Sequence, residues 1–424
     1  MRVIVKIVHI NKTDAGGGAA VAALRIHRAL LRSGIDSHFV VQEQKRKEIN
    51  EHHTSNSLWC RTMNFMRFVC ERLTILPHEK EASLRYNFSI ANTGQDITTM
   101  PVVKEADVIH LHWVNQGFLS LNDIKRLFSM GKPVIWTLHD MWPFTGGCHY
   151  AGTCLEFNEK CGYCPFLKRP AKNDISTKVF NMKKQIYSKV NLTVVSCSHW
   201  LCTLTKGSTL FRNTPAFTIP NPIDTNFYNL LNKEQCRIDL GLPKDKKLIL
   251  FGAAKITDVR KGFRYLEEAL QILKDNFPAF SNEIELIVFG KLNNSSKKRF
   301  AFKTHNLKFI SDPKTLVKLY NAADTFVLPS LQDNLPNTVV ESMSCGTPVV
   351  GFRIGGVPEM IEHMKTGYLA EVKNSLSLAN GIYNMLLSGG DEQRQMVRNS
   401  AIKMFSEEIV AQQYISVYGK AISR

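Results

Sequence analysis

The sequence contains no uninterrupted run of about 18 apolar residues, so it predicts no membrane-spanning helix. It also has no recognisable secretory signal, because its first apolar run, Arg2–His9, is short and interrupted by charge. That run is typical of a first β-strand, and we expect a cytoplasmic protein. Lys and Arg are dispersed rather than gathered in long basic runs, which makes a nucleic-acid-binding protein the less favoured interpretation.

A dinucleotide-binding fingerprint is absent as well. The segment Asp14-Ala15-Gly16-Gly17-Gly18 follows the first predicted strand, but it does not have the spacing G-x-G-x-x-G. No acidic residue closes the second predicted strand in the pattern that a nicotinamide dinucleotide needs. The three glycines still let a ligand approach the backbone closely at a helix N-terminus, where N–H groups favour an anion.

The charge is strongly unbalanced: 54 Lys and Arg stand against 37 Asp and Glu, a formal net charge of +17. Such an excess favours an anionic partner, namely nucleotide phosphates, anionic lipid or nucleic acid. A basic surface that only serves solubility is the alternative interpretation.

The order of apolar runs predicts two α/β domains. At 424 residues the chain is long enough for two or three domains. Strand-like and helix-like segments alternate, which favours doubly wound, mostly parallel sheets. The alternation breaks at Ile219–Asp224, where two prolines flank an asparagine, and then restarts. We expect a Rossmann-like domain over 1–220, with an inserted segment at 44–100 and a Cys-rich loop at 148–164, a second Rossmann-like domain over 221–405, and a last helix, 406–424, that packs back on the first domain.

The inserted segment contains one helix of mixed character, Leu58–Leu76. Phe65, Phe68, Val69 and Leu73 share one face of this helix, and arginines fall mostly elsewhere. The favoured interpretation is a helix packed on its own domain. The alternative is a helix that lies on a membrane surface or binds the acceptor.

The most informative stretch is Asp324–Glu359. It predicts a strand, a polar loop, a helix that begins at Pro336, a second strand and a Gly355-Gly356 turn. Asp333 lies in the loop, and Glu341 lies about a turn and a half into the helix. Earlier in the second predicted domain, Arg260-Lys261-Gly262 opens a helix after a strand, and two cations at that place suit a diphosphate.

Four of the ten cysteines are clustered: Cys148, Cys154, Cys161 and Cys164. Their spacing includes one C-x2-C pair, which suits a structural zinc site, although the other spacings are not standard. A disulfide or free thiols are the alternatives. A site with four cysteines has no open position, so we do not expect catalytic zinc.

Taken together in order, these motifs resemble those of the retaining glycosyltransferases of family 4, which have the GT-B fold of two Rossmann-like domains facing across a cleft. The segments that carry the resemblance are the glycine-rich loop, Asn221-Pro-Ile-Asp224, Lys261-Gly262, D-N-L-P-N-T-V-V-E from Asp333 to Glu341, the G-G-V-P-E that follows, and Thr366–Leu369. Two departures stand out. Asp333 replaces the first glutamate of E-x7-E, and alanine stands where the family has an arginine, so Lys255 or Arg260 is expected to supply the second cation.

The resemblance implies the roles of the site residues. Glu341 would accept hydrogen bonds from the nucleotide ribose, while Asp333, Asn334 and Leu335 would face the donor sugar. Lys261 and Arg260 would stabilise the diphosphate, and Gly17 and Gly18 would also contact the donor. His139, in the His139-Asp140 element, would lie beside the donor sugar; His110 and His112 are as readily explained by packing.

The resulting hypothesis is a transferase that moves a sugar from a nucleoside diphosphate sugar to a glycan or lipid-linked glycan, with retention of configuration and no catalytic metal. The resemblance suggests assembly of capsule, lipopolysaccharide or another bacterial surface polysaccharide, in contact with the inner face of an anionic membrane. A nucleotide-sugar epimerase of the same fold and, less favoured, a basic nucleic-acid-binding protein are the alternatives.

Overall fold

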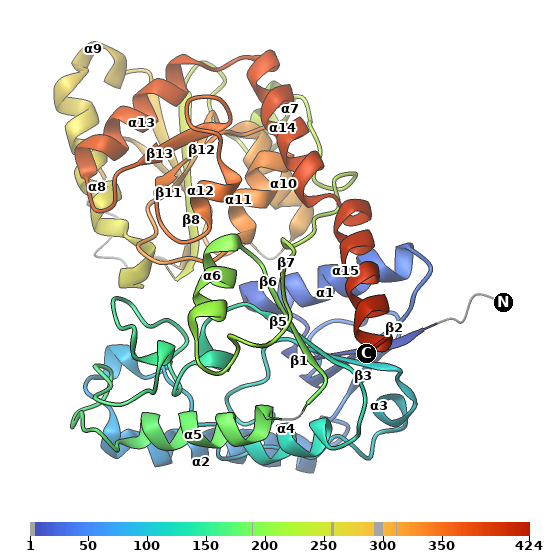
Figure 1. The fold of residues 1–424 in the computed structure, drawn as a ribbon. Coiled ribbons are helices and arrows are strands. Elements are labelled where there is room, and N and C mark those ends of the chain that lie inside the picture. Colours follow the sequence, from blue (N-terminus) through green and yellow to red (C-terminus); the bar gives the residue numbers. More distant parts are fainter. Residues whose placement is uncertain (1–4, 189, 256–257, 292–299, 311) are drawn as a thin grey trace. The chain divides into compact units, whose positions relative to one another are not determined.

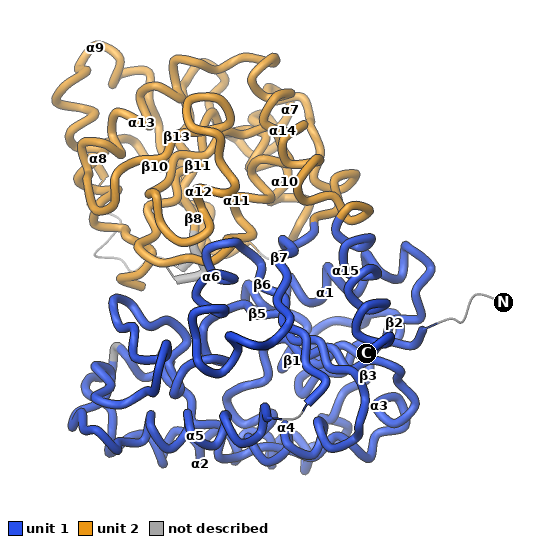
Figure 2. Tube along the Cα trace, in the orientation of Figure 1, with its two compact units in different colours: residues 1–222, 410–424 blue, residues 223–409 orange. Residues whose placement is uncertain are grey.

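The computed structural model describes residues 5–188, 190–255, 258–291, 300–310 and 312–424 (Figure 1). The chain divides into two compact units, coloured separately in Figure 2. Unit 1 consists of residues 1–222 and 410–424, and unit 2 of residues 223–409. The chain therefore leaves unit 1 once and returns to it at its end.

Unit 1 is built on a seven-stranded sheet with the order β3-β2-β1-β4-β5-β6-β7, and every pair of neighbours is parallel. Its strands are β1 (Lys6–Thr13), β2 (Asp36–Glu43), β3 (Glu51–His53), β4 (Val108–Leu111), β5 (Val134–Leu138), β6 (Leu192–Ser196) and β7 (Ala216–Thr218). The order reverses between β1 and β4, which is where ligands bind in open α/β sheets.

Helices cover both faces of this sheet, as the alternation of apolar residues requires. Ile109 and Leu111 of β4 belong to a core shared with α4 and α5, whereas Val108 faces a core shared with α1 and α15. The α-helices of unit 1 are α1 (Gly18–Arg32), α2 (Leu58–Ile75), α3 (Pro101–Glu105), α4 (Leu121–Phe128), α5 (Ile175–Tyr187), α6 (His199–Gly207) and most of α15 (Glu407–Ile422). Five 3₁₀ turns lie at Leu76–His78, Ala82–Leu84, Trp142–Phe144, Glu156–Asn158 and, in unit 2, Val259–Lys261.

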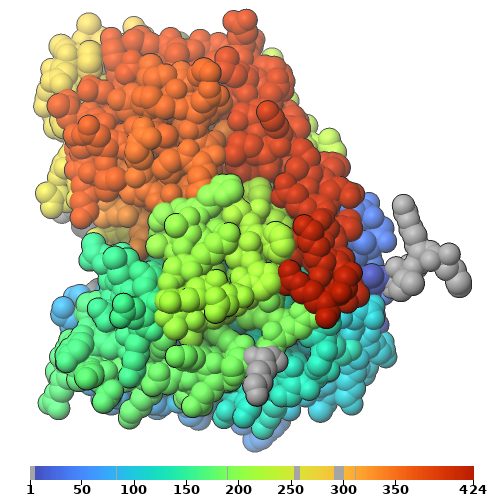
Figure 3. All heavy atoms as spheres, viewed as in Figure 1, coloured from blue at the N-terminus to red at the C-terminus, as the bar shows by residue number. Residues whose placement is uncertain are grey.

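The last helix, α15, completes the core of unit 1. Val410, Tyr414 and Tyr418 are buried together with Ile7 of β1 and Ile26 of α1. The opposite side of the helix is polar and lies on the molecular surface, in red in Figure 3.

Unit 2 repeats the architecture with a six-stranded parallel sheet of order β10-β9-β8-β11-β12-β13. Its strands are β8 (Lys247–Lys255), β9 (Ile284–Lys291), β10 (Thr304–Asn306), β11 (Thr325–Leu328), β12 (Val349–Phe352) and β13 (Gly367–Ala370). Its helices are α7 (Lys233–Asp239), α8 (Phe263–Asn276), α9 (Pro278–Ser281), α10 (Pro313–Ala322), α11 (Asn337–Ser344), α12 (Val357–Met360), α13 (Ser375–Leu387) and α14 (Asp391–Phe405). Two parallel sheets flanked by helices confirm the predicted doubly wound α/β class.

Helix α2 packs on its own domain, as the favoured interpretation has it. Its buried residues are Asn64, Glu71 and Ile75, whereas Phe65 and Leu73 are 63% and 60% exposed. Two contacts with later segments of unit 1 set this orientation. The buried Glu71 carboxylate accepts hydrogen bonds from Ser89 and from the Ala91 N–H. In addition, the backbone of α2 approaches Gly117 so closely that a Cβ there would lie 2.6 Å from the Phe68 nitrogen.

The apolar side of α2 is therefore an exposed surface. Its exposed apolar side chains are Leu58, Trp59, Phe65, Met66 and Leu73. None of the helices in the described part of the chain is both long and apolar enough to cross a membrane.

Candidate active site

The predicted residues of unit 2 gather where the strand order reverses, between β8 and β11. Lys261 follows β8, and Asp333 and Glu341 follow β11. Because β8 and β11 are parallel neighbours, the segments that leave their carboxyl ends meet at one edge of the sheet.

Lys261 and Asp333 form an ion pair across these two segments. The Lys261 Nζ lies 2.9 Å from Asp333 Oδ2, and the side chains are 30% and 16% exposed. The backbone fixes this arrangement: Gly262 has φ 64°, and a Cβ on it would lie 1.8 Å from the Pro329 oxygen. The N–H of Leu331 also donates to the Arg260 oxygen at 2.7 Å. The structure thus holds the predicted cation and the predicted first carboxylate side by side.

Arg260 is tied to its own loop. Its guanidinium pairs with Asp258 at 2.8 Å, and the Asp258 side chain caps the same turn by accepting from the Arg260 N–H at 3.0 Å. Burial raises the pKa of Asp258, but the bonds and charge of Arg260 outweigh it and hold the pKa below its usual value. Lys255, the other predicted cation, has a side chain that lies outside the described part of the structure.

Glu341 lies in the second turn of α11 and is 7% exposed. Its Oε2 accepts a hydrogen bond from the hydroxyl of Tyr320, on α10, at 3.0 Å. Burial, together with the neighbouring Glu341 charge, raises the pKa of Tyr320 well above its ordinary value, so Tyr320 stays a donor. A buried glutamate oriented in this way presents a hydrogen-bond acceptor of fixed direction.

Gly355 and Gly356 pack against the backbone of the loop between β11 and α11. The N–H of Gly356 donates to the Asn334 oxygen at 3.0 Å, and a Cβ on Gly355, which has φ 52°, would lie 1.8 Å from the Asp333 oxygen. Asn334 and Leu335 are buried. Pro336 is the N-cap of α11 rather than its first residue, and no side chain caps this end of the helix. Its first N–H groups therefore suit an anion.

In unit 1 the glycine-rich loop joins β1 to α1. Gly17 is the N-cap and Gly18 the first residue of α1, again with no side-chain cap. Asp14 fixes the loop by accepting from the backbone N–H groups of Lys45 and Arg46. Gly16 needs to be glycine for its φ of 95°, whereas a Cβ on Gly17 would meet open space.

His139 is half-buried just beyond the end of β5. One ring nitrogen, Nε2, lies 3.2 Å from Nδ1 of His112, and the other lies 3.8 Å from Sγ of Cys197. Burial lowers the pKa of His139 to about 4, so its imidazole is neutral at pH 7.

The sequence reasoning missed that His139 ends a chain of buried histidines. Nδ1 of His9 lies 2.9 Å from Nε2 of His112, whose other nitrogen contacts His139. His110 packs beside them and contacts the hydroxyls of Tyr418 and Thr137, each at 2.7 Å. Burial lowers the pKa of His9, His110 and His112 well below 6.5. The signal in the sequence is limited to the place of these residues in or just after strands, because their meeting depends on the register of those strands.

His9, His110 and His112 are also the one group in the described ranges with three ligand nitrogens within 4.8 Å of one another. Both nitrogens of His110 and both of His112 already have hydrogen-bond partners inside unit 1. The arrangement therefore acts as a packed hydrogen-bond network, and His110 and His112 have the packing role that the sequence allowed.

The residue after His139 anchors the Cys-rich loop. Asp140 accepts hydrogen bonds from Nδ1 of His149 at 2.7 Å, Nε1 of Trp113 at 3.0 Å and the N–H of Trp142 at 2.9 Å. Burial raises the pKa of Asp140, but His149 and these donors outweigh it and hold the pKa below its usual value. Cys148, Cys154, Cys161 and Cys164 all line one pocket in this loop, and no disulfide joins them in the structure.

Two family profiles match the chain. The one described as Glycosyltransferase Family 4 matches residues 16–227, and the one described as Glycosyl transferases group 1 matches residues 232–404. Together they cover both units.

Individual relatives agree with these profiles. WcaC of Escherichia coli, which carries the name of a colanic acid biosynthesis glycosyl transferase, is 26% identical over 385 residues, which is 84% of this chain and 85% of that protein. An enzyme of Campylobacter jejuni, N,N'-diacetylbacillosaminyl-diphospho-undecaprenol alpha-1,3-N-acetylgalactosaminyltransferase, is 28% identical over 183 residues. That match covers 42% of this chain and about half, 46%, of the relative.

Solved structures share the whole fold. Sucrose-phosphate synthase of Thermosynechococcus elongatus has a TM-score of 0.67 at 16% identity and covers 99% of both chains. HepE of Anabaena, solved in complex with UDP, has a TM-score of 0.62 at 16% identity and covers 98% of this chain and 100% of that one. With family profiles over both units and this fold, the chain belongs to glycosyltransferase family 4 and is a glycosyltransferase of the GT-B fold.

Proposed function

We propose that this glycosyltransferase moves a sugar from a nucleoside diphosphate sugar to a glycan or lipid-linked glycan, with retention of configuration, during the synthesis of a polysaccharide. The name of WcaC supports the polysaccharide, and the Campylobacter name supports a lipid-linked acceptor. HepE has been solved with UDP and with UDP-glucose, which supports a nucleotide-sugar donor.

The observation that carries the proposal is the convergence of Lys261, Asp333 and Glu341 at the reversal of strand order in unit 2. Glu341, held by Tyr320, would accept from the ribose hydroxyls through its fixed carboxylate. The diphosphate would lie at the uncapped N-terminus of α11, where backbone N–H groups and the helix dipole favour negative charge.

Lys261 would serve as the cation for the leaving group. In the present arrangement Asp333 neutralises it, so an entering diphosphate has to compete with that carboxylate. Once the cation turns to the diphosphate, Asp333 is released to accept a hydrogen bond from a sugar hydroxyl. This exchange would couple donor binding to the orientation of the sugar. Arg260 would add a second cation by the same kind of exchange with Asp258.

Departure of the nucleoside diphosphate develops negative charge on its terminal phosphate, and preorganised cations and N–H groups stabilise that charge best. In a retaining reaction the acceptor hydroxyl attacks the face that the diphosphate leaves, and its proton passes to a phosphate oxygen. His139, neutral at pH 7, would donate one hydrogen bond to the sugar. Nδ1 is the nitrogen best suited to change partner, because its sulfur contact is the longer one. Gly17 and Gly18 would present backbone N–H groups to anionic parts of the substrates.

The epimerase alternative is less well supported. It needs acid and base groups on several sides of one sugar ring. The two carboxylates of the unit 2 site are instead engaged by Lys261 and Tyr320, which suits binding.

The proposal is tested by donor binding and turnover. Purified protein is screened with UDP- and GDP-sugars, and nucleoside diphosphate release is measured with and without lipid-linked acceptors. Glu341→Gln removes the charge but keeps the shape, and we expect donor affinity to fall by about 1.5–3 kcal/mol, or roughly 10–150-fold in Kd. Glu362→Gln, at an exposed glutamate paired with Lys365, is the matched control and should bind normally. Normal donor binding by Glu341→Gln, or no release from any donor, would contradict the proposal.

Peripheral membrane contact is the finer part of this proposal, and the exposed apolar side of α2 supports it. Trp59, Phe65 and Leu73 are exposed on this helix, and Arg61 lies beside them. The double substitution Phe65→Ser/Leu73→Ser should reduce cosedimentation with anionic lipid vesicles. Leu387→Ser changes an equally exposed leucine of unit 2 and should not. Equal sedimentation of both variants and the parent protein would remove α2 from the proposal.

A further inference from the structure

The Cys-rich loop has little regular structure to hold it. Between Thr145 and the start of α5 at Ile175, its only named element is the 3₁₀ turn Glu156–Asn158. Long segments of this kind in a compact unit are uncommon and are usually either functional or fixed by another device.

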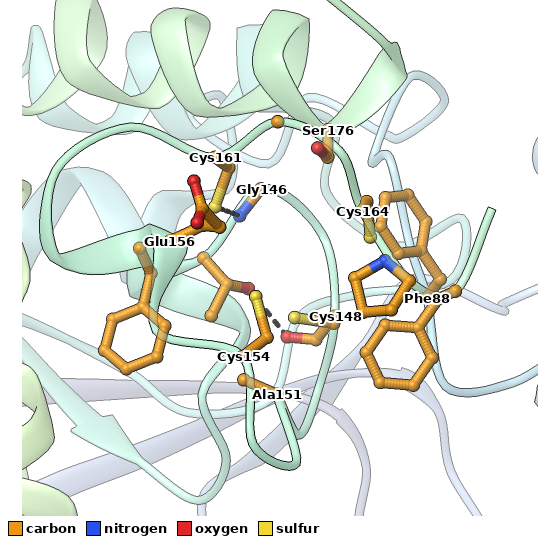
Figure 4. Close-up of a pocket in the computed structure, with 14 residues that line it drawn as sticks. Phe88, Gly146, Cys148, Ala151, Cys154, Glu156, Cys161, Cys164 and Ser176 are labelled. Atoms are coloured by element: carbon orange, nitrogen blue, oxygen red, sulfur yellow. Dashed lines mark hydrogen bonds between the residues drawn. The ribbon is translucent and has the colours of Figure 1, made fainter. Parts of the chain in front are cut away.

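The loop folds so that all four of its clustered cysteines line one pocket. Figure 4 shows Cys148, Cys154, Cys161 and Cys164 around this space, with Phe88 on one side. Cys148, Cys161 and Cys164 are buried and Cys154 is half-buried, although they come from separate parts of the loop. Apolar packing alone does not require four sulfurs at one place.

Backbone contacts hold two of these cysteines in position. The N–H of Gly146 donates to Sγ of Cys161 at 3.1 Å, a contact that favours a thiolate over a thiol. The cap of α5, Asp174, accepts from the N–H of Cys164 at 2.9 Å. A Cβ on Gly146 would lie 2.8 Å from the Cβ of Cys161, so the close approach of these two loop segments requires glycine at position 146.

The turn between Cys161 and Cys164 is strained. Tyr163 has φ 45°, in the left-handed region, although it is not a glycine. Such a conformation costs on the order of 1 kcal/mol and persists where the surroundings compensate for it. Here it brings the two cysteines of the C-x2-C pair to the same pocket.

A buried cation accompanies the cysteines. Lys183 of α5 is completely buried, and its ammonium donates to the carbonyl oxygen of Thr145 at 3.0 Å. Cys148 and Cys161 interact with it electrostatically. The negative charge of Asp140 also acts on this amine, and a zinc ion with four thiolates, with a net charge of −2, would add to it.

From this convergence of four cysteines we propose that Cys148, Cys154, Cys161 and Cys164 bind one structural zinc ion. Binding replaces the four thiol protons by the metal and releases them to solvent. The ion would fix the loop that carries His149. The side chain of His149 is hydrogen-bonded to Asp140, the residue directly after His139. The role is structural, because four protein ligands leave no position for a substrate.

The sulfurs must move together to bind the ion. Zinc–sulfur bonds of about 2.3 Å in a tetrahedron place neighbouring sulfurs about 3.8 Å apart. Within the described ranges, no three of the four sulfurs lie within 4.8 Å of one another. Rotation about the cysteine side-chain bonds would close this gap, since all four already line the same space.

Two other uses of the cysteines fit less well. Cys148, Cys161 and Cys164 are buried, which leaves them poorly accessible as nucleophiles or redox sensors. Disulfides are the other alternative, and the structure joins no two of these four sulfurs in a disulfide.

The test is the metal content of the full-length protein, purified without a metal-chelating column. We expect close to one zinc per chain by elemental analysis, and cobalt substitution should give the absorption of a tetrahedral tetrathiolate site. Cys161→Ser/Cys164→Ser should lose this zinc and these bands. The matched control is Cys60→Ser/Cys70→Ser, which changes two cysteines of α2 outside the pocket and should retain both.

Three results would overturn the proposal. The parent protein could contain no zinc and four alkylatable thiols under reducing conditions. Its mass without reductant could instead reveal disulfides among the four cysteines. Zinc could also persist in Cys161→Ser/Cys164→Ser, which would place it elsewhere, for example at the buried histidines. If that variant does not fold, the metal content and cobalt spectrum of the parent protein still decide.

Discussion

Unit 1 should lose stability between pH 7.5 and pH 5.5 because of its buried histidines. Burial lowers the pKa of His27 and His139 to about 4 and that of His9, His110 and His112 well below 6.5. In the unfolded chain a histidine titrates near 6.5. Below that pH the unfolded state binds protons that the folded state does not, so the stability present above pH 6.5 is lost as the pH falls toward 4.

The size of the effect follows from linkage. With an unfolded pKa of 6.5 and a folded pKa of about 4, one histidine lowers the free energy of unfolding by about 1.3 kcal/mol over this interval. Five independent histidines would give roughly 6–7 kcal/mol as an upper bound. Glu51 acts in the opposite direction, because burial raises its pKa to about 7, and it offsets about 1.8 kcal/mol. The net loss of about 4–5 kcal/mol is a large part of the stability of an ordinary domain.

Urea unfolding followed by tryptophan fluorescence measures this loss for unit 1 alone. All five tryptophans, at positions 59, 113, 136, 142 and 200, belong to unit 1. His27→Gln should reduce the pH dependence by about 1.3 kcal/mol, whatever it does to stability at pH 7.5. A net loss below about 1 kcal/mol in the parent protein would refute the reasoning.

Three further predictions concern a glycine, a hydrogen bond and the last helix. Gly262→Ala should destabilise unit 2 by about 2 kcal/mol or more in thermal unfolding, because the added Cβ would meet the Pro329 oxygen. Gly241→Ala, at a glycine with a similar φ and open space around it, should cost about 1 kcal/mol. Equal losses of stability in the two variants would contradict the steric argument. Tyr320→Phe should weaken donor binding about 5-fold in calorimetry without unfolding the protein, since it removes one hydrogen bond to Glu341; unchanged affinity would separate that bond from binding. Deleting residues 410–424 should abolish the near-ultraviolet circular dichroism of unit 1, because it removes Tyr414 and Tyr418 from the core; a native spectrum would show that α15 is dispensable.

Much of the fold could be predicted because strands and amphipathic helices leave strong local patterns. The strand, helix and second strand predicted within Asp324–Glu359 are present as β11, α11 and β12. Residues of the unit 2 site were also accessible to prediction, because they lie in short motifs directly after strands. The structure brings Lys261 and Asp333 together, while their part in catalysis stays a prediction.

Features that depend on distant parts of the chain could not be predicted. Which face of α2 is buried depends on Glu71 and on the close approach of the helix to Gly117, and neither leaves a periodic signal in the sequence. The histidine network requires the register of β1 against β4, which aligns His9 with His110. Likewise, the pairing of Arg260 with Asp258 is a matter of side-chain geometry.

The place of α15 has a consequence for the order in which the protein is made. The ribosome completes residues 1–222 well before it reaches Val410, yet the core of unit 1 includes Val410, Tyr414 and Tyr418. Until then, the apolar face that α15 covers is exposed on the nascent chain. Unit 2 is contiguous and can fold as soon as it emerges. The first unit to be synthesised is therefore the last to be finished, and premature termination anywhere before the final helix leaves it incomplete.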